Sequence, residues 1–323
     1  MGVFLAAVIA GAVLVSGDAA ASGHDAGAGG GVPTQIEPWP ETEARIAILY
    51  HRRRILAPVH VEGVGERLFI IDTAAGTSLI SSSLRDQLAL GADDVRRQRI
   101  RGATGVIELD YVRLPGLEFG EVRHDDIWSV VADLNEFQPV HGVEVAGVLG
   151  VDVLSRTDVR LDLAAGEIVL LDRRARTGPQ AEANDGVPFH SRAQAGFVQF
   201  TARIDGAPVA AVLDTGAREG VLNWAAAGLA GLDPQSAAIV RTGGVSSGLD
   251  GAGVAHAKAR LDGLCLGSAC FDRAPVRIAD LAVFGLVGAQ GGDGPSMLVG
   301  ADMLERCVAE ILYSRGVLRL CEG

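Results

Sequence analysis

The sequence predicts a mainly β protein with two similar lobes, each a closed, barrel-like set of strands with a few short helices. Short runs of Val, Ile and Leu, bounded by Gly, Asp and Pro, recur along the whole chain, as they do in β-strands. The 323 residues, of which 48% are hydrophobic, suffice for two domains of roughly 150 residues, each with its own core. The third observation is an internal repeat, which sets the architecture more firmly than any single motif.

The repeat is centred on two Asp-Thr sequences, each at the end of an apolar run. Residues 69–75 read FIIDTAA, and residues 211–217 read AVLDTGA. Three further landmarks keep the same order in both halves: VEG at 61–63 with IDG at 204–206, VLGVDVL at 148–154 with LVGADML at 298–304, and the turn glycines Gly166 and Gly316. Four matching landmarks indicate two copies of one folding unit.

The repeat and the composition together divide the chain. We expect an N-terminal lobe at residues 45–172, a polar linker at 173–185 and a C-terminal lobe at 186–323. Residues 22–44, rich in Gly, Ala and Pro, read as a flexible leader, and residues 1–21 as a signal peptide. Short helices are expected at 81–90, 151–155, 223–229 and 301–306.

The signal peptide is predicted from an uncharged apolar run at residues 3–15, which is shorter than the roughly 20 residues of a membrane span. Small residues with Ala19 and Ala21 at cleavage-site spacing follow it. No Lys or Arg precedes the run, so a retained anchor and a buried apolar helix stay as alternatives. We expect a periplasmic or secreted protein without a membrane span after cleavage.

Four cysteines, all in the second half, agree with export because an even count permits two disulfides. A tight turn at 267–268 would place Cys265 opposite Cys270, and a turn at 314–316 would bring Cys307 close to Cys321. Four buried free thiols are the alternative. The spacing is not that of a zinc site. We expect no metal and no cofactor.

The net charge of −12 argues against two classes of partner. An acidic surface repels phosphate backbones and anionic lipids. We expect neither nucleic-acid binding nor membrane adhesion.

An apolar strand that ends in Asp-Thr-Gly presents its carboxylate at the strand end. The glycine lets backbone N–H groups approach the carboxylate, and the Thr hydroxyl can anchor the loop. Two such loops related by a pseudo-twofold axis place Asp72 and Asp214 side by side, where they share one proton. The ionised carboxylate can then deprotonate a water while the protonated one polarises a carbonyl.

With these motifs the sequence resembles the aspartic proteases, most closely bacterial retropepsin-like domains in tandem, as in the two-lobed pepsin arrangement. The resemblance covers roughly residues 45–172 and 186–323. It implies an acid-protease fold with the active cleft between the lobes, a peptide or protein substrate, and a monomer. It also implies catalytic Asp72 and Asp214 in loops supported by Thr73, Ala74, Thr215 and Gly216.

The family places an apolar-apolar-Gly segment beneath each Asp loop and a mobile hairpin, the flap, over the substrate. The segments that end at Gly150 and Gly300 fit the first role. The glycine-rich stretches at 101–105 and 242–248 fit the second, with Gly102, Gly105, Gly243 and Gly244 as flap candidates.

Two departures from the family pattern motivate an alternative. Ala74 stands where the family has Gly, and Arg218 follows the second loop where a small or polar residue is usual. The chain could therefore be a catalytically weakened or inactive peptide-binding protein of the same fold. A duplicated β-fold that keeps the aspartates only as loop caps is a further alternative. Asp152 and Asp302 also repeat, but each lies between a glycine and a helix and reads as a structural cap.

A distant alternative is a serine hydrolase that uses Ser246. Residues 244–248 match G-x-S-x-G, and His256 follows. That motif needs a strand before it and a helix after it, and the glycine-rich residues after Ser246 disfavour a helix. Trp128 and Trp224 read as core or cleft wall.

Overall fold

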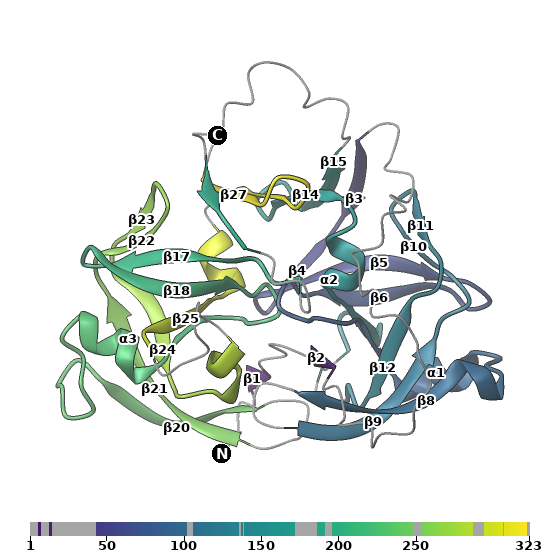
Figure 1. Cartoon of the computed structure of the whole chain (residues 1–323), viewed down its shortest axis with the longest axis horizontal. Helices are drawn as coiled ribbons and strands as arrows, with labels where there is room; N and C mark the ends of the chain where they lie inside the picture. The colour runs from purple at the N-terminus through teal and green to yellow at the C-terminus, as the bar shows by residue number, and fades with distance from the viewer. Residues whose placement is uncertain are drawn as a thin grey trace, which may run out of the picture.

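The computed structural model describes residues 6–7, 13–14, 43–101, 106–135, 137, 139–171, 186–190, 196–247, 253–286, 294–305 and 307–321. Figure 1 shows two β lobes side by side, the first in purple to teal and the second in green to yellow, with a smaller sheet bridging them. The mainly β, two-lobed fold expected from the sequence is confirmed.

The first lobe is one strongly curled sheet with short helices around it. Its elements are β4 (Leu49–His51), β5 (Arg54–Val61), β6 (Gly65–Ile71), β7 (Leu79–Ser81), α1 (Ser82–Gln87), η1 (Ala92–Asp94), β8 (Val95–Arg101), β9 (Val106–Arg113), β10 (Leu117–Phe119), β11 (Val122–His124), β12 (Trp128–Ala132), β13 (Val145–Leu149) and α2 (Val151–Leu154).

The second lobe repeats this plan. Its elements are β17 (Gln199–Ile204), β18 (Ala207–Leu213), β19 (Gly220–Leu222), α3 (Trp224–Leu229), β20 (Val240–Ser247), β21 (Gly253–Leu261), β22 (Leu264–Leu266), β23 (Ala269–Phe271), β24 (Ala274–Ile278), η3 (Ala282–Leu286), β25 (Ser296–Val299) and η4 (Ala301–Leu304). The neighbour order β5-β6-β13-β7-β12-β9-β8 in the first lobe corresponds, strand by strand, to β17-β18-β25-β19-β24-β21-β20 in the second.

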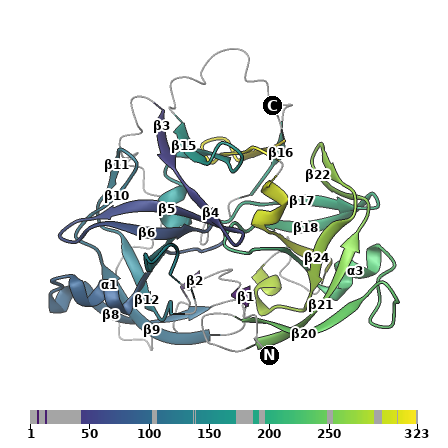
Figure 2. The same ribbon diagram turned by 180° about the vertical axis from the view of Figure 1, so that it is seen from behind.

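A third sheet joins the two halves and is seen edge-on above the lobes in Figure 2. Its order is β16 (Val187–Pro188), β27 (Val317–Leu320), β26 (Ala309–Leu312), β14 (Asp158–Asp162), β15 (Glu167–Leu171) and β3 (Ala44–Ala47). The antiparallel pairing of β14 with β26 crosses from one lobe to the other. The turns expected at Gly166 and Gly316 close the two hairpins, and both glycines have positive φ.

The helices are shorter than the sequence pattern predicted. The first begins after Ser81, whose side chain accepts a hydrogen bond from the Leu84 N–H, and ends at Gln87 rather than residue 90. The last, at 301–304, is a 3₁₀ turn. The reason is that strands carry nearly all of the core. Each helix packs briefly against a few central strands, α1 against β7, β12 and β13 and α3 against β19 and β25, before the chain returns to the sheet.

Two short strands near the N-terminus, β1 (Ala6–Ala7) and β2 (Val13–Leu14), pair with the outer edges of β20 and β8. The predicted linker lies outside the described residues, as does almost all of the predicted leader. Among the residues that the structure describes, no helix is long and apolar enough to cross a membrane.

Candidate active site

Asp72 and Asp214 occupy equivalent places, each directly after the strand that enters the centre of its lobe. The last residues of β6 and β18 are buried, and the backbone N–H of each aspartate donates to the carbonyl of a neighbouring parallel strand, at Leu149 (3.0 Å) and Val299 (2.9 Å). Both side chains are fully buried. Each aspartate is therefore held by its own sheet, as the repeat predicts.

The two loops are tied to each other by crossed hydrogen bonds between the threonines. The Thr73 hydroxyl donates to the Leu213 carbonyl (2.7 Å), and the Thr215 hydroxyl donates to the Ile71 carbonyl (2.7 Å). Each hydroxyl oxygen also accepts from the other threonine's N–H, at 3.1 and 3.2 Å. Each Thr thus uses its hydroxyl as donor and acceptor across the lobe boundary, which fixes the spacing of the neighbouring aspartates.

In each aspartate one carboxylate oxygen accepts a hydrogen bond, and the other has no hydrogen-bond partner among the described residues. Asp72 Oδ1 accepts from the Ala74 N–H (2.8 Å), and Asp214 Oδ1 accepts from the Ala217 N–H (2.9 Å). Within the part of the chain that the structure describes, Oδ2 of each is buried without a hydrogen-bond partner. Buried polar atoms are nearly always paired, so two orphaned carboxylate oxygens mark a place for a proton, a water or a ligand.

Burial raises the pKa of both aspartates. For Asp72 the charge of Asp214 adds to the rise, and N–H groups of Ala74, Ala75 and Gly216 oppose it. For Asp214 burial raises the pKa to about 7, and the N–H groups of Ala217 and Gly216 oppose the rise. A coupled pair in this environment retains one proton at a pH where isolated carboxyls are ionised.

Gly216 and Ala74, at equivalent positions, make the pair asymmetric. A Cβ at Gly216 would collide with the Asp72 carboxylate, so that carboxylate rests directly on the glycine backbone. Ala74 is buried among apolar side chains and still donates its N–H to Asp72. The Gly216 N–H lowers the pKa of both aspartates, whereas the Ala74 N–H lowers only that of Asp72. The Ala74 methyl group is therefore compatible with the folded loop.

The apolar-apolar-Gly segments lie against the loops. The N–H after each glycine donates to the loop carbonyl, from Val151 to Ala75 (2.9 Å) and from Ala301 to Ala217 (2.8 Å). A Cβ at Gly300 would lie 2.5–2.8 Å from the backbone of the Glu219–Gly220 peptide, so no larger residue fits there. These glycines are needed for close approach of two backbones.

Asp152 and Asp302 are structural, but they do not cap their own helices. The Asp152 carboxylate accepts from the Ser78 N–H (3.0 Å) and hydroxyl (2.8 Å). The Asp302 carboxylate accepts from the Gly220 N–H (3.1 Å). Each therefore fastens the segment that leaves the aspartate loop. Ser78 was missed in the sequence because its contact is 74 residues away along the chain.

The two flap stretches lie on hairpins of equivalent position, β8–β9 and β20–β21. Gly102 and Gly105 fall outside the described residues. Gly243 and Gly244 lie within β20, where the register shifts between Arg241 and Val245 and Gly243 takes a φ of +66°. They form a bulge in the strand rather than the hairpin tip.

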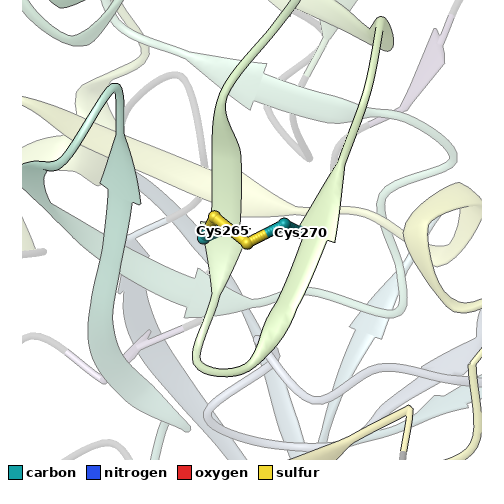
Figure 3. The surroundings of a disulfide bond; sticks show 2 residues. All are labelled: Cys265 and Cys270. Carbon is teal, nitrogen blue, oxygen red and sulfur yellow. A yellow bond between two sulfur atoms is a disulfide. The ribbon is translucent and has the colours of Figure 1, made fainter.

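The cysteines pair as Cys265–Cys270 and Cys307–Cys321. The first joins the strands of the tight β22–β23 hairpin, as Figure 3 shows, and the second lies at the base of the β26–β27 hairpin.

Among the described residues, no cluster of His, Cys, Asp or Glu could hold a metal ion.

Ser246 and His256, the pair behind the serine hydrolase alternative, are in contact, with 3.2 Å between Oγ and Nδ1. They lie on the paired strands β20 and β21, Ser246 one residue before the end of β20 and His256 within β21. This is a different setting from the strand-to-helix turn that the G-x-S-x-G motif requires. Burial, with Arg277 and Lys258 nearby, lowers the pKa of His256 to about 4, which makes it a weak base.

Trp128 and Trp224 are both partly buried and lie in different settings. The Trp128 ring stacks on Tyr111 at 5.3 Å, and the Arg96 guanidinium lies 4.2 Å from its centroid. Trp224 begins α3, packs against the main core and donates its backbone N–H to Asp280.

Arg218 is half-buried beside the second loop.

Comparison with known proteins agrees with this architecture. No curated protein matches the chain. The family model described as aspartyl protease matches twice, at residues 57–153 and 200–303, so that each match contains one aspartate loop and its downstream glycine segment. The two matches cover more than half of the chain and coincide with the two copies of the repeat, and the chain therefore belongs to the aspartyl protease family.

Proposed function

We propose that this chain is an exported aspartic endopeptidase that hydrolyses peptide bonds with a water activated by Asp72 and Asp214. The observation that carries the proposal is the pair of Oδ2 atoms, buried and without a hydrogen-bond partner among the described residues, on loops held together by Thr73 and Thr215. The ionised aspartate removes a proton from the water, and the protonated one donates to the scissile carbonyl oxygen.

Export is supported by the two disulfides and by the apolar run at residues 3–15. The protein would work in the periplasm or outside the cell as a monomer, since both aspartates come from one chain. Its substrate would be a peptide that lies in extended form between the β8–β9 and β20–β21 hairpins.

The test is hydrolysis of a peptide mixture by the purified protein and by Asp72→Asn and Asp214→Asn. We expect each substitution to abolish turnover while the far-ultraviolet circular dichroism and melting temperature stay close to those of the original protein. Inhibition by a statine peptide, which mimics the transition state, should accompany the activity. Full activity in either variant would exclude the dyad.

Ala74 favours a second candidate, a peptide-binding protein without turnover. In that case the statine peptide would bind and no peptide would be cleaved. Ser246→Ala addresses the serine hydrolase: complete loss of turnover in this variant, with the aspartate variants active, would transfer the chemistry to Ser246.

A further inference from the structure

The two lobes share one topology but differ in their side chains on one face of the sheet. The first lobe carries apolar side chains on this face of β9 and β12, and the second carries polar ones on the corresponding face of β21 and β24. In the first lobe Val130 pairs with Leu79 and with Tyr111. In the second, Arg277 pairs with Val221 and Lys258. Leu79 and Val221 are the seventh residues after their aspartates.

Arg277 therefore stands where the first lobe has Val130, and Lys258 stands where it has Tyr111. By the same register His256 corresponds to Leu109. Ser246, opposite Val254, corresponds to Ile100, opposite Ile107. Glu219, five residues after its aspartate, corresponds to Thr77.

The second-lobe set forms two neighbouring polar groups, Ser246 with His256 and Glu219 with its three cations. Glu219 accepts from Arg277 Nε (2.6 Å) and from Arg53 Nη1 (3.0 Å), and Lys258 Nζ lies 3.6 Å away. Ser246 is fully buried, Arg277 is 7% exposed and His256 8%. Burying such groups is costly, and replacing buried ion pairs by apolar side chains is often neutral or stabilising. The first lobe builds the same hairpin with Ile100, Leu109 and Val130 in these places, so the fold does not require the polar set.

The cluster gathers three cations around one carboxylate, and the carboxyl group of Asp302 lies near Arg53 and Glu219. Three cations, Arg53, Lys258 and Arg277, surround the one carboxylate of Glu219, and Arg53 shares its charge with Glu305. Lys258 is the most exposed member, with 42% of its side chain accessible. An anion that reached Lys258 would meet a cation whose charge Glu219 compensates only in part.

The cluster also lies close to the aspartate loops. Val254, on the same face of β21 as His256, packs against the apolar cluster that contains Ala74, the second residue after Asp72. The outer edge of β20 can pair with an additional strand: Ala6 and Ala7 run parallel to Ser246 and Ser247 in register. A peptide strand in this place would pass beside Ser246.

We propose that Ser246, His256, Lys258 and Arg277 form a specificity subsite that binds an acidic side chain of the peptide substrate, within a few residues of the scissile bond. This inference rests on the proposed peptidase function. Lys258, the accessible member, supplies the charge that meets the acidic side chain, and the nearly buried Arg277, His256 and Ser246 form the polar floor beneath it. The corresponding surface of the first lobe, with its apolar side chains and Tyr111, would take an apolar residue.

The test measures kcat/KM for peptides that differ at one position at a time, carrying Glu, Gln, Leu or Lys. One position should prefer Glu over Gln by about tenfold or more, as expected for a charge-assisted contact. Lys258→Gln should remove most of that preference, and Lys258→Glu should shift it toward Lys. Arg260→Gln is the matched control, because Arg260 lies on the same face of β21 two residues further along and bonds the Arg273 carbonyl (3.3 Å). It should keep the original preference.

A binding measurement separates the subsite from the peptidase proposal. Fluorescence anisotropy of labelled Glu and Gln peptides with Asp214→Asn reports recognition without turnover. A Glu preference in binding that Lys258→Gln removes, together with no cleavage by the unsubstituted protein, supports the subsite and refutes the peptidase. Cleavage without any acidic preference, or a preference unchanged in both Lys258 variants, refutes the subsite alone. Absence of peptide binding refutes both.

Discussion

At the scale of single residues, the site depends on which atoms can approach the two aspartates. Asp72 rests on the Gly216 backbone and has three N–H groups near it, whereas Asp214 has two. Ala74 shows that the first loop folds with a methyl group where the second has none. The two positions therefore tolerate side chains differently.

We predict that Gly216→Ala lowers kcat by roughly 100-fold or more, because its Cβ would displace the Asp72 carboxylate and a small misplacement of a reacting group costs about that factor. Ala74→Gly should retain activity or increase it. Steady-state kinetics on both variants provide the measurement, with melting temperatures as the control for folding. Equal losses in the two variants would contradict the asymmetry.

The raised pKa values of the dyad predict its pH dependence. Burial disfavours the charged form, so the pair keeps its shared proton to higher pH than exposed carboxyls do. Ala75 and Ala217 have no hydroxyl that could donate to the carboxylates and lower these pKa values. We expect a bell-shaped profile of kcat/KM with its maximum at mildly acidic to neutral pH. A maximum at about pH 2–3, the range that strongly lowered dyad pKa values give, would show that another donor stabilises the ionised form.

At the scale of elements, two loops from different lobes act as one unit because each threonine serves the other loop. Thr73 and Thr215 are buried, and together they make four hydrogen bonds across the boundary. Removing either hydroxyl leaves an N–H and a carbonyl of the opposite loop unpaired in a buried place. Such groups cost about 1–3 kcal/mol each.

Thr73→Val and Thr215→Val should each lower the melting temperature, by roughly 2–4 °C for every kcal/mol lost, and reduce kcat. Thr73→Ser and Thr215→Ser keep the hydroxyl and are the matched controls. Thermal denaturation and peptide hydrolysis of the four variants would test this. Valine variants with serine-like stability and activity would show that the crossed bonds are dispensable.

At the scale of the whole molecule, the lobes are coupled by more than the site. One apolar cluster runs through both lobes and the bridging sheet. Across the β14–β26 pairing, Asp158 accepts from the Ser314 N–H (2.9 Å) and hydroxyl (2.8 Å), and Arg160 pairs with Glu310 at 3.0 Å. A shared core and a continuous sheet favour a single cooperative unit.

We therefore expect the two lobes to unfold together. In a Trp39→Phe background, the further change Trp224→Phe leaves Trp128 to report the unfolding of the first lobe. The change Trp128→Phe instead leaves Trp224 to report the unfolding of the second lobe. The two fluorescence transitions in urea should share one midpoint. Separate midpoints would show that the lobes are independent domains.

Local patterns in the sequence were enough to predict the β class, the two copies of the repeat, the two aspartates at strand ends and the hairpins that face Cys265 to Cys270 and Cys307 to Cys321. These features depend on neighbouring residues, because alternation, turn glycines and hairpin register act over a few positions. The positions of the short helices were predicted correctly, but their predicted ranges were too long, since sheet packing rather than helix propensity decides where they end.

Only the tertiary structure decided which groups meet across long separations. The Thr73–Thr215 contact joins residues 142 positions apart, and Asp152 reaches Ser78 instead of capping its own helix. The polar cluster around Glu219 draws Arg53 from the first lobe and Arg277 from a distant strand. No local pattern encodes these pairs. Each depends on the register and curvature of strands whose partners lie far away in the chain, and burial then sets the pKa of the carboxyl groups that the fold encloses.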